Sequence, residues 1–68
     1  MSAETHSLIR FIAKKIDELR KEQSGYIAGG GAKDFAEYRH VCGVIRGLTH
    51  AETILQDLVQ RLETDDDN

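Results

Sequence analysis

The sequence has no proline, no tryptophan and a single cysteine among its 68 residues. Without a proline–glycine repeat, paired cysteines or a strongly biased composition, it is neither a collagen, nor a disulfide-bonded miniprotein, nor a low-complexity chain. Its size also excludes a multidomain enzyme. Because Cys42 has no second cysteine in the chain with which to form a disulfide, we expect a reducing cytosol or a virus-like assembly rather than secretion.

Long apolar runs and an excess of basic residues are absent as well. Uninterrupted apolar stretches extend over only a few residues, whereas a membrane span needs about 20. The first residues also lack the charged and then apolar segments of a signal peptide. The formal net charge is -3, and an acidic chain is poorly suited to neutralising DNA phosphates. We therefore expect neither a membrane nor a nucleic acid as partner.

Helical periodicity is the main signal that the sequence does contain. Residues 3–24 carry a single apolar stripe that predicts an amphipathic helix with one buried face; it consists of Leu8, Ile9, Ile12, Ile16 and Leu19. Residues 34–64 predict a longer second helix, which begins with a variant capping box formed by Asp34 and Glu37. The apolar residues of this helix recur at alternating spacings of three and four, as in a heptad seam; they are Val41, Val44, Leu48, Ala51, Leu55, Leu58 and Leu62.

The expected fold is all-α, with residues 1–68 forming a single domain, an antiparallel two-helix hairpin. A glycine-rich turn over residues 25–33 joins the helices, with Gly25 ending the first helix at positive φ, and an acidic tail occupies residues 65–68. The apolar face of the second helix is wider than one partner helix can cover. Since exposed apolar surface of this extent marks an interface, we expect the hairpin to oligomerise or to dock on a larger protein.

Two features of the expected interface allow more than one interpretation. Gly43 and Gly47 permit close approach of another helix, which is either the first helix of the same chain or a partner chain. Phe11 lies off the apolar stripe and is either an exposed anchor for a partner or packed under Tyr26. The expected interface residues are Phe11, Tyr38, Val41, Gly43, Val44, Ile45, Gly47, Leu48, Ala51, Leu55, Leu58 and Leu62.

Motifs for chemistry are missing from the sequence. The segment Gly29–Lys33 departs from the phosphate-binding loop pattern, and the spacing of the histidines and Cys42 supplies no metal site within one chain. We therefore expect no enzyme, no catalytic residue, no metal and no cofactor. Arg39, Arg46 and His50 form either a solvated polar face or a contact for nucleic acid or an acidic protein.

Residues 33–48, KDFAEYRHVCGVIRGL, carry a resemblance to a known group of proteins. They resemble small helical proteins of tailed bacteriophages, which have a KDFxEYxxxxGxIRGL-like segment after a glycine-containing turn and are often encoded near head, portal or packaging genes. The resemblance implies a phage origin, and hence the host cytoplasm and, for a structural role, the virion. It implies no activity and no catalytic residue.

These observations together predict a non-enzymatic phage structural or assembly protein that acts through helix–helix contacts. Its partner would be a second copy of itself or a larger head, portal or tail protein. One alternative is a small phage modulator that binds and inhibits or redirects a host enzyme, such as a polymerase, a nuclease or a defence protein. Another is a nucleic-acid-binding oligomer that uses Arg39 and Arg46.

Overall fold

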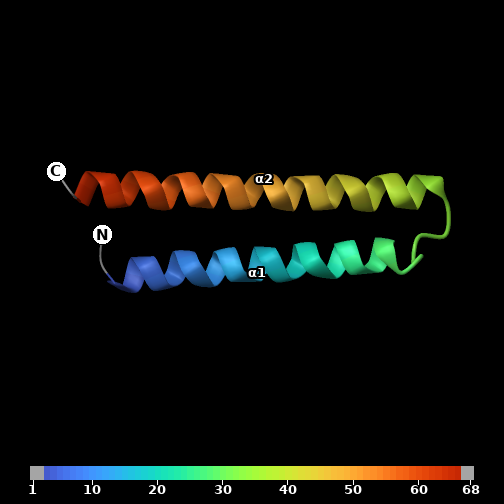
Figure 1. Cartoon of the computed structure of the whole chain (residues 1–68), viewed down its shortest axis with the longest axis horizontal. Coiled ribbons are helices and arrows are strands. Elements are labelled where there is room, and N and C mark those ends of the chain that lie inside the picture. Colours follow the sequence, from blue (N-terminus) through green and yellow to red (C-terminus); the bar gives the residue numbers. More distant parts are fainter. Residues whose placement is uncertain (1–2, 67–68) are drawn as a thin grey trace.

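The computed structural model describes residues 3–66 and consists of two helices, α1 (Ala3–Ala28) and α2 (Phe35–Asp66). They run side by side in opposite directions and are joined by residues 29–34, so both ends of the chain lie at the same end of the molecule (Figure 1). The Cα atoms occupy a flat rod of 52 × 16 × 12 Å. The expected all-α fold, with two helices packed against each other, is confirmed.

The end of α1 differs from the expectation. Gly25 lies inside the helix, and the residue with positive φ is Gly30, at 78°. The Gly31 N–H donates to the Tyr26 carbonyl at 2.9 Å and the Gly30 N–H donates to the Ile27 carbonyl at 3.1 Å, which is the Schellman arrangement. The helix continues because its last turn gains contacts with the loop and α2, and these offset the roughly 1 kcal/mol that an internal glycine costs.

The capping box expected at the start of α2 is confirmed in a modified form. The Asp34 carboxylate accepts the Glu37 N–H at 2.8 Å, and the Glu37 carboxylate accepts the Lys33 N–H at 3.1 Å. The Tyr26 hydroxyl donates to the other Glu37 oxygen. Glu37 thus ties the end of α1, the loop and the first turn of α2 together. Of the expected acidic tail, residues 65 and 66 continue α2, and residues 67–68 lie outside the described residues.

The hairpin has almost no interior. Among the described side chains only Ile9 and Val41 are buried, at 8% and 6% exposure. The expectation that the whole apolar stripe of α1 is buried is wrong, since Leu8, Ile12 and Leu19 are exposed. The reason is geometric: a single neighbouring helix covers only one side of α1, and this stripe is wider than that side.

One ion pair and one further polar contact link the two helices along their length. Arg20 Nε lies 2.7 Å from Glu52 Oε1 on α2, and Arg20 also donates to Asp17 at 2.7 Å. His6 Nε2 lies 3.8 Å from Glu63 Oε1 near the open end of the hairpin. The hydrogen bond from Arg20 is the main reason that the pKa of Asp17 lies below its ordinary value. The side chains near residue 20 of α1 therefore lie level with those near residue 52 of α2.

Candidate functional site

Apolar positions on both helices alternate between covered and open. In the heptad seam of α1, Ile9 and Ile16 are buried or half-buried against α2, whereas Ile12, Leu19 and Tyr26 are 40%, 48% and 41% exposed. In α2 the covered positions are Val41, Leu48, Leu55 and Leu62; of the intervening positions, Val44 and Leu58 are 37% and 41% exposed and Ala51 is half-buried. Most of the intervening positions therefore lack a partner within the hairpin.

The open positions of both helices lie on the same broad side of the hairpin. Each follows a covered position by three residues, and three residues advance a helix by about 300°, so each is rotated by about 60° in the same sense. Since the helices are antiparallel, equal rotations place side chains on the same side of the pair. The Tyr26–Glu37 bond joins the helices there. We call this surface the open face; it comprises Leu8, Ile12, Leu19, Tyr26, Val44, Ala51 and Leu58.

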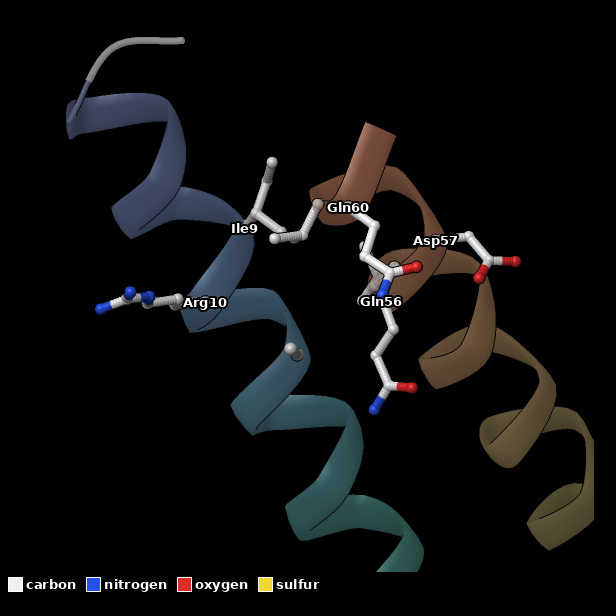
Figure 2. A pocket seen from close by; sticks show the side chains of 8 residues that line it. Ile9, Arg10, Gln56, Asp57 and Gln60 are labelled. Atoms are coloured by element: carbon white, nitrogen blue, oxygen red, sulfur yellow. The ribbon is translucent and has the colours of Figure 1, made fainter. Parts of the chain in front are cut away.

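The opposite broad side is more polar and contains a shallow groove of about 400 Å³ near the chain ends. Figure 2 shows Ile9, Gln56 and Gln60 directed toward this groove, whereas Arg10 and Asp57 point away from it. The small side chain of its remaining α1 residue, Ala13, leaves the space unfilled. The groove thus offers apolar surface and two amides, but no charged group is directed into it. Its lining is Ile9, Arg10, Ala13, Leu55, Gln56, Asp57, Val59 and Gln60.

The structure divides the expected interface residues into three groups. The first group faces α1 and consists of Val41, Ile45, Leu48, Leu55 and Leu62. The second group lies on the open face or on its rim, by which we mean the side chains along the outer edge of the face on each helix. It consists of Gly43, Val44, Gly47, Ala51 and Leu58. Tyr38 and Phe11 form the third group, because Tyr38 lies on the polar side, stacked on Phe35 with ring centroids 6.3 Å apart, and Phe11 lies on the outer surface of α1.

The structure contradicts one of the two interpretations of the helix glycines and one of the two interpretations of Phe11. A Cβ atom built at Gly43 or Gly47 meets nothing within 4 Å, so the interpretation that α1 approaches closely at these residues is wrong. The interpretation that Phe11 packs under Tyr26 is also wrong, because fifteen residues of one helix separate them by about 22 Å. Phe11 is 58% exposed, and Lys15 Nζ lies 5.5 Å from the centre of its ring.

Sequence reasoning missed the α1 half of the open face. Leu8, Ile12, Leu19 and Tyr26 were expected either under the second helix or in the turn. The available signal was the spacing of positions 9, 12, 16, 19, 23 and 26, which alternates between three and four as it does in α2. Such a seam points toward the centre of a bundle of several helices, midway between two neighbours, rather than directly at one neighbour.

Titratable groups in residues 3–66 are mostly dispersed. No three His, Cys, Asp or Glu side chains gather there in a way that would hold a metal ion. Hydrogen bonding to Glu37 raises the pKa of Tyr26, and hydrogen bonding to Cys42 raises the pKa of Tyr38. Both tyrosines therefore keep their hydroxyl protons at neutral pH, and Tyr26 serves as a hydrogen-bond donor that closes the loop.

The apolar segments of α1 and α2 are too short and too interrupted by charge for either helix, as described, to cross a membrane. Comparison of the chain with models of protein families, with curated proteins and with solved structures finds no match.

Proposed function

We propose that the chain is a non-enzymatic protein-interaction module whose open face packs against other helices, and that it serves as a structural or assembly protein of a tailed phage. The open face is the observation that supports the first part. It is a set of apolar side chains on one broad side of a hairpin in which, among the described residues, only Ile9 and Val41 are buried. Soluble domains normally cover apolar surface of this extent, either in a core or at an interface.

The phage assignment is supported by the sequence of residues 33–48 alone. This segment contributes to the proposed surface, because it includes Val44 of the open face and Gly43 and Gly47 at its rim. It also contains the capping residues Asp34 and Glu37, which begin α2. The residues that carry the resemblance thus include the end of the loop and one end of the open face, so the resemblance falls on part of the surface that we propose for binding.

Particles produced by the phage that encodes the chain provide the test. Quantitative mass spectrometry of purified heads, tails and assembly intermediates should find the chain at a fixed ratio to the major structural proteins. Replacing Leu58 on the open face with glutamate should remove it from the particles, whereas Gln60→Glu on the polar side should not. Absence of the chain from all particles and intermediates would contradict the proposal; its recovery in a defined complex with a host enzyme would favour the modulator alternative.

A further inference from the structure

The partner that fits the open face best is a second copy of the same chain. We propose that two hairpins join through their open faces into an antiparallel four-helix bundle in which α1 of each copy packs on α2 of the other. This inference rests on the proposed function, since it names the occupant of the surface described there. Three observations carry it: the alternation along the seams, the area of the face, and the charges at its rims.

The alternation of covered and open apolar positions along each helix is the pattern expected for two adjacent helices of a four-helix bundle without the other two. In such a bundle each helix directs its seam between two neighbours, so alternate seam residues contact one neighbour and the rest contact the other. Here Ile9 and Ile16 contact the neighbour that is present, whereas Ile12 and Leu19 lack one. A second hairpin supplies two helices with the same alternation, so each copy offers the surface that the other requires, as a two-fold interface demands.

The area of the face also suits a dimer. The broad side of the rod measures 52 by 16 Å, or roughly 800 Å², close to the contribution of one partner to a standard stable interface. The hairpin needs such a contribution, because a chain of this size has little core of its own, and among its described side chains only two are buried. Pairing through this face would cover five of the large side chains that the hairpin leaves exposed, namely Ile12, Leu19, Tyr26, Val44 and Leu58.

The charges along the rims of the open face favour one orientation. The rim on α1 carries Glu18 and Glu22 with a single lysine, Lys15, and is acidic, whereas on the α2 rim Arg61 lies beside Asp57 and the two charges cancel. When α1 lies on α1 of the second copy, the two acidic rims meet, which is unfavourable. When α1 lies on α2, each acidic rim meets a rim without net charge. The two copies therefore point the same way, with both loops at one end of the bundle.

Small residues on the α2 rim support the same arrangement. Gly43 and Gly47 lie along this edge of α2, and the hairpin leaves the space around them empty. Glycine inside a helix carries a cost in stability relative to alanine, which close approach of another helix would justify. In the proposed bundle the helix at this edge is α1 of the second copy.

The first test is the mass of the purified chain by light scattering over a wide range of concentrations. We expect a dimer of about twice the 7.6 kDa of one chain. Leu19→Ala on the open face should raise the dissociation constant at least about tenfold, because both copies lose the contact, whereas Gln56→Ala on the polar side should leave it unchanged. A monomer at every concentration, or equal effects of the two substitutions, would overturn the proposal.

The second test reports the orientation. A spin label is attached at position 33 of the loop through Lys33→Cys in a Cys42→Ser background, and the distance between the two labels of the dimer is measured. Copies that point the same way place the labels within about 30 Å, given helix spacings of about 10 Å and the reach of the labels. Copies that point in opposite directions separate them by about the 52 Å length of the rod, which would overturn the packing of α1 on α2.

The outcomes also separate this inference from the proposed function. A monomeric chain that is nevertheless found at fixed copy number in particles would contradict the dimer and leave the assembly role in place. A dimer with the expected label distance that is absent from particles would support the dimer and contradict the assembly role.

Discussion

Alanine substitution at two glycines should have opposite effects on stability, and the sign at each follows from its surroundings. Gly47 lies in the middle of α2, and a Cβ atom there meets no other atom within 4 Å. Gly47→Ala therefore removes only the conformational cost of an internal glycine, about 0.5–1 kcal/mol. For a domain of this size that gain corresponds to a rise in melting temperature of roughly 2–8 °C.

Gly31 presents the contrary case. A Cβ atom there would lie 2.4 Å from Cε1 and 2.5 Å from Cδ1 of the Tyr26 ring. The ring must move, and its hydroxyl then leaves Glu37, which opens the connection between the two helices. Gly31→Ala should therefore lower the melting temperature, although it makes the same chemical change as Gly47→Ala.

Thermal unfolding followed by circular dichroism, repeated over a hundredfold range of protein concentration, measures both effects. At the lowest concentration the gain from Gly47→Ala should be complete. At higher concentrations it should shrink if a second copy packs on this edge of α2. A loss of stability for Gly47→Ala at the lowest concentration would show that α1 does approach Gly47, and would refute the placement of the helices.

Three further predictions concern the ends of the helices and the charged pairs. The pKa of Tyr26, followed by NMR of its labelled ring, should lie above 10 and fall in Glu37→Gln, because a carboxylate is a stronger acceptor than an amide. The contribution of this bond to stability is present below pH 10 and is lost as the pH rises through the raised pKa; an unchanged pKa in Glu37→Gln would contradict the bond. Asp34→Ala removes the cap of α2 and should lower the free energy of unfolding by about 1 kcal/mol in urea titrations, with no loss if the cap were unimportant. Since the pKa of Asp17 is lowered, chiefly by Arg20, its contribution is present above pH 3.8 and is lost as the pH falls below that value. Asp17→Asn should therefore flatten the acid limb of the stability profile, and an identical limb would count against the pair.

Much of the fold could be read from the sequence because local signals determine it. Asp34 and Glu37 mark the start of α2 through their own spacing, and the structure shows both hydrogen bonds of the modified capping box. The alternating apolar spacing of α2 likewise predicts a long helix. These features depend on residues within one or two turns of each other, so no knowledge of the rest of the molecule is needed.

The end of α1 could not be read in the same way. Gly25 and Gly30 are equally capable of positive φ, and the choice depends on whether the residues between them gain by staying helical. They do, because Tyr26 reaches Glu37 on the other helix and Ile27 is half-buried. Both gains are tertiary, since they exist only once the two helices are side by side.

The α2 part of the open face could be predicted from the sequence, but the α1 part could not. The width of the α2 seam predicts that one partner helix cannot cover it, but the stripe of α1 has the appearance of an ordinary buried face. Only the arrangement of the two helices shows that Ile12 and Leu19 turn away from α2 while Ile9 turns toward it. The difference is a rotation of about 60°, which helical periodicity alone does not resolve.

The positions of the two buried side chains have a mechanical consequence. Ile9 lies in the second turn of α1, and Val41 lies in the second turn of α2, soon after the loop. They are separated by roughly 27 Å along the rod, if 1.5 Å is taken for each residue of helix. Two buried contacts that far apart define both the crossing angle and the axial register of the two helices, whereas a single central contact would leave the crossing angle free. The hairpin can therefore keep its straight shape, and it offers its open face as one surface rather than as two helices that a partner must first align.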